Sequence, residues 1–265
     1  MIEIFDLFVY NPVYNLLIFI YSTFSFKDFG IAIVFVTLII KFLLIPLSKK
    51  QIESQKKMQE LQPRIKDVQE KYKNDKEKQS RALLELYKEN KTNPFSGCLP
   101  MIVQLIFLIA IYRVLFNISS AGLKVDASAL YSFVPDPGQI NKMFLGIIDL
   151  SSTLNISHLA FSDVPHLILV LLAAGSQYFQ TKMLMGAKRE ENKHKKQSGG
   201  DSKPDFSEIM TKQMLYLGPL LTLFIGVKFP AGLALYWFIS TGFMIIQQYY
   251  LAKNTEKAIK AIDKK

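Results

Sequence analysis

Apolar residues in this chain are gathered into long blocks that are separated by charged segments. Each block has about 20 residues, which is the length that an α-helix needs to cross the hydrocarbon core of a bilayer. The pattern therefore predicts an all-α membrane protein with five transmembrane helices. We expect them at residues 29–47, 95–116, 164–184, 210–227 and 231–251.

Residues 4–24 are also apolar and aromatic, but polar residues interrupt them. The interruptions include Asp6, Asn11, Pro12 and Asn15. Polar groups and an internal proline are costly in a helix that is surrounded by lipid. We therefore favour an amphipathic helix that lies in the membrane interface. A sixth transmembrane span is the alternative.

Lysine and arginine fall on one side of this five-span arrangement. Segment 49–93 carries 13 of them, segment 186–212 carries seven and the tail 252–265 carries five. Segment 118–163 carries only two, beside four aspartates. Because basic loops remain in the cytoplasm, we expect the N-terminus outside, segment 118–163 on the extracytoplasmic side and a short basic tail inside. A sixth span would move only the N-terminus.

The charged segment 49–93 also contains apolar residues at helical spacing. A polar turn at residues 73–76 separates two such groups, which predicts a cytoplasmic hairpin of two amphipathic helices. A solvated charged linker is the alternative. The second basic loop, 186–209, contains Ser198-Gly199-Gly200 and favours a flexible connection. The apolar positions of the hairpin are Leu61, Ile65, Val68 and Tyr72 in the first helix and Leu83, Leu84, Leu86 and Tyr87 in the second.

Composition argues against several other classes of protein. The net charge of +10 would suit a nucleic-acid-binding protein, but such a protein has no use for the apolar blocks. Cys98 is the single cysteine and there are three histidines, so a Cys/His metal site is not expected. The sequence shows no nucleotide-binding loop, no catalytic motif and no carboxylate pair inside the spans. We expect no cofactor and no enzymatic activity.

Several polar residues lie inside the predicted spans, where they are expensive. Lys41 is about two turns from the cytoplasmic end of the first span, close enough for its side chain to snorkel to water instead. The amides and hydroxyls could each be interhelical hydrogen-bonding groups. Together with Lys41 they could line a water-containing cavity, with Trp237 as a wall. The polar set is Gln104, Gln177, Gln180, Ser240 and Thr241, with Gln247 as its weakest member because it lies near the cytoplasmic end; Arg113 is expected to be an interface anchor.

Five local sequences along the chain are distinctive. They are Asn11-Pro12-Val13-Tyr14-Asn15, Lys41-Phe42-Leu43-Leu44-Ile45-Pro46-Leu47-Ser48, Gln55-Lys56-Lys57-Met58-Gln59-Glu60-Leu61-Gln62-Pro63, Asn93-Pro94-Phe95-Ser96-Gly97-Cys98-Leu99-Pro100 and Phe229-Pro230-Ala231-Gly232-Leu233-Ala234-Leu235-Tyr236-Trp237. The most distinctive is the fourth, which is followed by Gln104. In this order the five sequences resemble the YidC/Oxa family of membrane protein insertases, and the resemblance covers essentially the whole chain.

The resemblance implies a five-helix core around a hydrophilic groove that is open to the cytoplasm and to lipid. By position, Lys41 matches the basic groove residue, which is usually arginine, and Gln177 or Gln180 and Trp237 match further groove residues. The hairpin, including Pro63, would recruit substrate. The second and fourth spans would offer an apolar path into lipid. Lysine gives a point charge where arginine would give a bidentate fork, and the short tail argues against strong ribosome docking.

The expected function is insertion and folding of newly made membrane proteins, without nucleotide hydrolysis. Expected partners are nascent chains with short acidic tails and the lipid bilayer, with a Sec translocon and the ribosome as further candidates, but no specific nucleic acid. The bacterial plasma membrane is the expected location, because the chain shows no transit peptide. Two alternatives remain open at this point: an assembly factor that does not insert proteins, and a small transporter.

Overall fold

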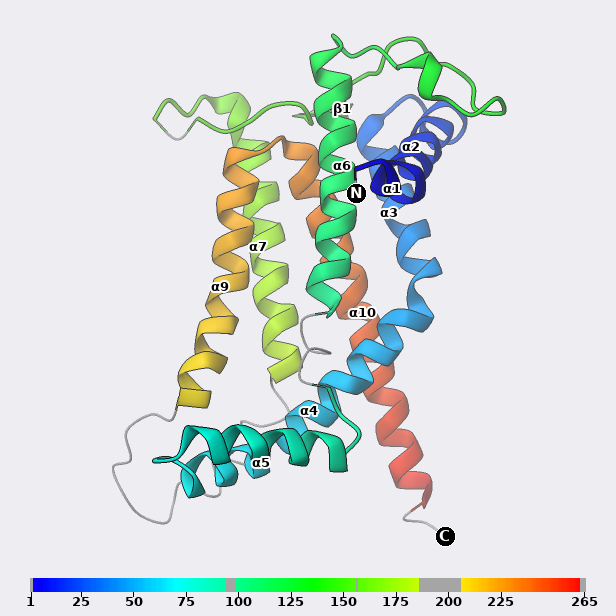
Figure 1. Cartoon of the computed structure of the whole chain (residues 1–265). Coiled ribbons are helices and arrows are strands. Elements are labelled where there is room, and N and C mark those ends of the chain that lie inside the picture. The colour runs from blue at the N-terminus through cyan, green and yellow to red at the C-terminus, as the bar shows by residue number, and fades with distance from the viewer. Residues whose placement is uncertain (1, 94–98, 156, 186–205, 263–265) are drawn as a thin grey trace. The chain divides into compact units, whose positions relative to one another are not determined.

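The computed structural model describes residues 2–93, 99–155, 157–185 and 206–262 (Figure 1). The described chain is mostly helical, with one small two-stranded sheet. Its elements are α1 (Ile2–Phe5), the π-helix η1 (Asp6–Tyr10), α2 (Asn11–Thr23), α3 (Phe29–Leu43), α4 (Ile45–Lys71), α5 (Lys76–Glu89), α6 (Leu99–Ser120), η3 (Ala127–Ala129), β1 (Met143–Phe144), β2 (Ile148–Asp149), η4 (Phe161–Asp163), α7 (Val164–Met185), α9 (Phe206–Lys228) and α10 (Ala231–Ile262).

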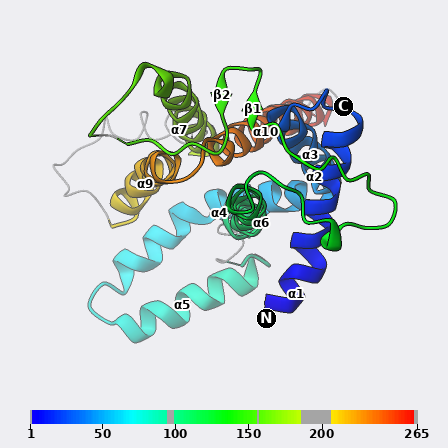
Figure 2. The same cartoon turned by 90° about the horizontal axis from the view of Figure 1, so that it is seen from above.

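The described residues form two compact units. Residues 43–105 make the smaller unit, and residues 1–42 and 106–265 make the larger one. In the smaller unit, α4 and α5 form a helical hairpin (Figure 2). Asp75 caps α5 by accepting a hydrogen bond from the Lys78 N–H at 3.0 Å.

A small apolar core holds this hairpin together. Leu61, Ile65 and Leu86 are buried, and four partly buried residues pack against them: Met58, Val68, Leu83 and Tyr87. Three further residues of the predicted hairpin set differ from these. Pro63 is exposed within α4, and Tyr72 lies half-buried at the end of that helix. The apolar spacing in the sequence thus corresponds to one packed face, but Pro63 and the exposed Leu84 are not part of it.

Helix α7 is central to the larger unit, because it packs along both α9 and α10 (Figure 1). Gly226 allows α9 to approach closely, since a Cβ there would lie 2.8 Å from Val170 Cγ1. Nearby, the buried His166 ring nitrogen Nε2 lies 3.1 Å from the Gly226 carbonyl oxygen. Close backbone approach and a polar side-chain contact therefore join these two helices.

The connection between α6 and α7, residues 121–163, is bonded to the N-terminal helix α2. The buried Asn15 side chain donates to the Ala129 carbonyl at 3.0 Å and accepts from the Tyr131 N–H at 2.6 Å. The hydroxyls of Tyr14 and Tyr21 accept hydrogen bonds from backbone N–H groups of the connection at 2.9 and 2.8 Å. The polar residues that interrupt the first apolar block therefore bind another part of the protein.

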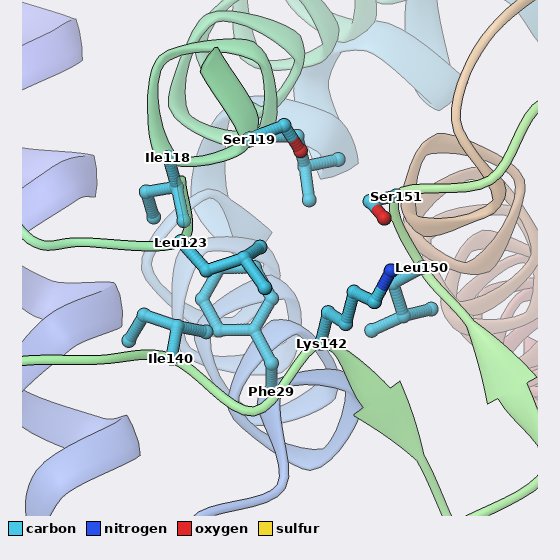
Figure 3. A pocket seen from close by; sticks show the side chains of 9 residues that line it. Phe29, Ile118, Ser119, Leu123, Ile140, Lys142, Leu150 and Ser151 are labelled. Carbon is cyan, nitrogen blue, oxygen red and sulfur yellow. The ribbon is translucent and has the colours of Figure 1, made fainter. Parts of the chain in front are cut away.

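The same connection contacts the start of α3. Strands β1 and β2 pair in antiparallel register, and the turn between them donates the Leu145 N–H to Asp28 at 2.6 Å. Gly30 is required at this contact, because a Cβ there would lie 2.2 Å from Phe144 Cδ2. A small pocket is left beside this contact, lined in part by Phe29, Ile118 and Leu150 (Figure 3).

The α6–α7 connection also supplies hydrogen-bond acceptors for the first N–H groups of α10. The first N–H groups of a helix have no partner within the helix. Here the Ala231 and Gly232 N–H groups donate to the carbonyls of Ser152 and Leu150, each at 3.0 Å. The Leu154 N–H in turn donates to the Val227 carbonyl in α9 at 3.3 Å. The tight turn between α9 and α10 is thus held by backbone hydrogen bonds from residues 150–154.

Helix bounds differ most from the predicted spans at the end of α3 and at the end of α10. The block 29–47 is not one helix, because α3 ends at Leu43 and α4 begins at Ile45. Pro46 lies in the first turn of α4, and it has no N–H to donate to the Phe42 carbonyl. Helix α10 continues to Ile262, so most of the predicted tail is helical. Residues 186–205, most of the predicted basic loop, lie outside the described residues.

Two helical stretches in the described chain, Glu3–Thr23 and Ile102–Ser120, are long and apolar enough to cross a bilayer. A third candidate arises if Phe29–Leu43 and Ile45–Met58 are counted as one broken span. Helix α9 contributes the shorter apolar stretch Leu215–Lys228. Helices α7 and α10 have sufficient length, with 22 and 32 residues, but polar side chains lower their mean hydropathy. Those side chains form the site described next.

Candidate functional site

A line of polar contacts joins α7 to α10, and we call it the polar seam: Gln177, Gln180, Trp237, Thr241 and Met244. Gln177 is its centre. Its Oε1 accepts hydrogen bonds from Trp237 Nε1 at 3.1 Å and from Thr241 Oγ1 at 3.4 Å. Gln180 Nε2 lies 3.5 Å from the sulfur of Met244, which is a weak acceptor.

Helical spacing explains why these side chains meet. Trp237, Thr241 and Met244 follow one another at intervals of four and three residues, so they share one face of α10. Gln177 and Gln180 are likewise three residues apart on α7. Two facing stripes therefore meet along the contact between the helices.

The seam is largely shielded from its surroundings. Trp237, Thr241 and Gln180 are buried, and Gln177 is half-buried. Ser240 is also fully buried on α10, next to the seam in sequence. The side-chain amide of Gln177 also lies near α9, since a Cβ added at Gly218 would lie 3.6 Å from Gln177 Nε2. This places a primary amide, an indole N–H and hydroxyl groups among three helices.

Lys41 lies on α3, in the last turn of that helix. A cation is favourable at this end, where the helix dipole is negative. Lys41 is one helical turn from the buried Thr37, and it is partly exposed. Its neighbour Phe42 packs edge-on against Phe243 of α10, with ring centroids 5.1 Å apart. The end of α3 that carries Lys41 therefore contacts α10, which carries the seam residues Trp237, Thr241 and Met244.

The structure thus brings together four of the eight predicted cavity residues: Gln177, Gln180, Trp237 and Thr241. Gln247 is half-buried on α10. Ser240 lies on the same helix, and Lys41 lies on α3. Gln104 belongs to the smaller unit and is half-buried there.

Arg113 has a role that the sequence analysis did not find. Its guanidinium forms an ion pair with Asp6 of η1 and lies 4.6 Å from the centre of the Tyr10 ring. Asn117, one turn further along α6, donates to the Tyr10 hydroxyl at 2.7 Å. The sequence did show one acid, Asp6, and one base, Arg113, in two otherwise apolar segments. Their spacing in the sequence gives no indication that the two side chains meet.

A metal centre has no candidate ligands in the part of the chain that the structure describes. No group of three or more His, Cys, Asp or Glu side chains there could hold a metal ion. The chemistry that the seam offers is hydrogen bonding inside an otherwise apolar region.

Comparison with known proteins identifies the family. The sequence model of the 60Kd inner membrane protein family matches residues 19–258. The membrane protein insertase YidC of Fusobacterium nucleatum subsp. nucleatum is 32% identical over 249 residues, which are 93% of this chain and 98% of that protein. YidC of Magnetococcus marinus is 28% identical over 86% of this chain. YidC of Rickettsia felis is 32% identical over 92% of this chain.

The relatives differ in length. This chain covers only 33% of the Magnetococcus protein and 38% of the Rickettsia protein. Among solved structures, an active YidC insertase crystal structure with the first transmembrane domain resolved matches 93% of this chain and 46% of that one. The TM-score is 0.50 and the identity is 25%. By its matched residues and its helical fold, the chain belongs to the YidC family of membrane protein insertases, which are bacterial inner membrane proteins.

Proposed function

We propose that this protein inserts newly made integral membrane proteins into the bilayer and helps them to fold, alone or with a Sec translocon, without nucleotide hydrolysis. The observation that carries the proposal is the polar seam between α7 and α10. It sets hydrogen-bonding groups between helices whose outer faces are apolar, as the exposed Leu171 and Phe179 of α7 illustrate. A polar polypeptide segment that takes the place of their present partners would cost less to bring into the membrane than one that meets only apolar side chains.

The proposed arrangement has five membrane spans, formed by α3, α6, α7, α9 and the first part of α10, around a groove open to the cytoplasm. The α6–α7 connection lies outside and the α4–α5 hairpin inside, following the distribution of basic residues. The bonds that residues 150–154 make to the turn between α9 and α10 support an outer end that is closed.

In this arrangement, α1, η1 and α2 lie in the outer interface and do not form a span. The support comes from the bonds between α2 and the α6–α7 connection. They involve Tyr14, Asn15, Tyr21 and Ser22, which are spread over about 12 Å of helix. A helix that crossed the membrane would leave an outer loop within reach of one end only, whereas a helix lying in the interface can contact it along its length.

Lys41 provides the electrostatic part of the proposed mechanism. An acidic tail of the substrate is attracted to a cation on the groove side of α3, because the charge is weakly screened where water is scarce. Transfer of about 20 apolar residues of the substrate into lipid then supplies the driving force. The membrane potential adds or subtracts about 2.3 kcal/mol per charge for each 100 mV. The hairpin recruits the substrate before this step.

The test is insertion into sealed, translocon-free liposomes of a single-span substrate with a short acidic N-terminal tail. Protease protection of the tail reports insertion. We expect the wild-type protein and Lys41→Arg to protect the tail and Lys41→Glu to protect it much less. For a matched tail without acidic residues, Lys41→Glu should reduce protease protection less. Equal protection by all three proteins would refute the electrostatic step, and no protection by the wild-type protein would favour an assembly factor without insertion activity.

A further inference from the structure

The stripe of seam residues on α10 continues by one more position, Gln248. At about 100° per residue, Gln248 lies only about 20° around the helix from Trp237, whereas Gln247 lies about 80° away. Gln248 is also one turn, or about 6 Å, beyond Met244 along the axis. Trp237, Thr241 and Met244 all contact α7. Gln248 therefore extends the face of α10 that forms the seam, toward the cytoplasmic end of the proposed span.

Gln248 differs from the residues before it in its hydrogen bonding. It is buried, with 5% of its surface exposed. Neither its Oε1 nor its Nε2 has a hydrogen-bond partner in the described part of the chain. By contrast, the Oε1 of Gln177 accepts from two donors.

A buried amide without partners is unfavourable for the resting protein, because its donor and acceptor lose water and gain nothing in return. A glutamine that only filled space could be replaced by an apolar residue of similar shape. A glutamine with a structural role would be bonded to its neighbours. Gln248 is polar, buried and without a hydrogen-bond partner among the described residues, which points to a partner that arrives with a ligand.

The chemistry of the side chain defines that ligand. A primary amide presents an acceptor and a donor side by side, which is the complement of the C=O and N–H of a peptide backbone. A polypeptide that enters the membrane before its helix is complete carries such unpaired groups, and they are costly in an apolar environment. The polar tail next to a substrate's apolar segment has such unpaired backbone C=O and N–H groups.

We propose that Gln248 is a positioning residue at the cytoplasmic end of the polar seam, where its side-chain amide pairs with backbone groups of the entering substrate. The inference rests on the proposed insertase function. It adds a residue that acts on the backbone of the substrate, in contrast to Lys41, which acts on charged side chains. Its effect should therefore depend on the length of the polar tail and not on its charge.

The experiment compares Gln248→Met with Gln247→Met in the liposome assay. Methionine has nearly the same shape as glutamine but cannot form these hydrogen bonds. We expect Gln248→Met to slow protection of a polar tail about three- to tenfold, for acidic and neutral tails alike, and Gln247→Met, which changes an amide outside the seam face, to slow it clearly less. The thermal midpoint of Gln248→Met in detergent should equal or exceed that of the wild-type protein, because an unpaired polar group has been removed.

A second measurement detects the contact directly. In a Cys98→Ser background, Gln248→Cys should form a disulfide with a cysteine in the tail of a substrate arrested during insertion, and Gln247→Cys should not. Wild-type insertion rates for Gln248→Met, a lowered thermal midpoint, or equal disulfide formation at both positions would each overturn the inference. If the wild-type protein itself does not insert the substrate, the proposed function fails and this inference fails with it.

Discussion

The hydrogen bonds of Gln177 provide the sharpest test of the polar seam. The variant Gln177→Leu removes the acceptor that Trp237 Nε1 reaches at 3.1 Å and Thr241 Oγ1 reaches at 3.4 Å. Both donor residues are buried, with 7% and 3% of their surface exposed. They therefore cannot turn to bulk water when the acceptor is lost. We expect the protein to fold but to be less stable.

The magnitude follows from the two distances. The contact at 3.4 Å is longer than an ordinary hydrogen bond and contributes little. A buried donor that is left without a partner costs about 1–3 kcal/mol. Interhelical hydrogen bonds in membranes have averaged about 0.6 kcal/mol, with a maximum near 1.7 kcal/mol. We therefore expect Gln177→Leu to lower the free energy of unfolding by about 1–2 kcal/mol, mainly through Trp237.

A double-mutant cycle of Gln177→Leu and Trp237→Phe, measured by unfolding in mixed detergent micelles, separates this bond from packing. The double variant should be about 1 kcal/mol more stable than the sum of the single losses predicts. Gln180→Leu is the matched control, because its amide lies 3.5 Å from a sulfur atom and should lose less. Additive losses, or a larger loss for Gln180→Leu, would refute the seam as a hydrogen-bonded contact.

Three further predictions concern the contacts around the α6–α7 connection. Gly30→Ala places a Cβ 2.2 Å from the side chain of Phe144. The free energy of unfolding measured in detergent should therefore fall by about 1–3 kcal/mol, and unchanged stability would contradict the close approach. Burial raises the pKa of Asp149, but hydrogen bonds from its neighbours outweigh it and hold the pKa below its ordinary value of 3.8. The carboxylate therefore stabilises the fold above the pKa of the unfolded chain, and this contribution disappears as the pH falls through the lower folded pKa. Stability measured against pH should show Asp149→Asn below wild type at neutral pH and converging with it below about pH 4; a constant difference would refute this. Arg113→Met should speed proteolysis of residues 2–10 by removing the ion pair with Asp6, and the exchanged pair Asp6→Arg with Arg113→Asp should restore protection, whereas equal proteolysis of all variants would contradict the contact.

The sequence alone was sufficient for features that depend on local periodicity. Apolar blocks of about 20 residues predicted helices, and the described helices α6, α7, α9 and α10 lie where those blocks are. Apolar residues three and four apart in the hairpin correspond to its packed face around Leu61 and Leu86. The order of local sequences was enough to predict the family, which the comparisons confirm. These features are readable because each follows from neighbouring residues.

Other features depend on how helices are rotated and at what depth they meet, which no single stretch of sequence encodes. Gln177 and Trp237 are 60 residues apart, and only the packing of α7 on α10 brings them within 3.1 Å. Arg113 finds Asp6 across 107 residues for the same reason. Likewise, Gln248 differs from Gln247 because it lies on the face of α10 that contacts α7, and only the packing of the two helices shows which face that is. The sequence by itself determined which residues are polar inside apolar helices, and the tertiary structure decided which of them are paired and which is left with its hydrogen-bonding capacity open.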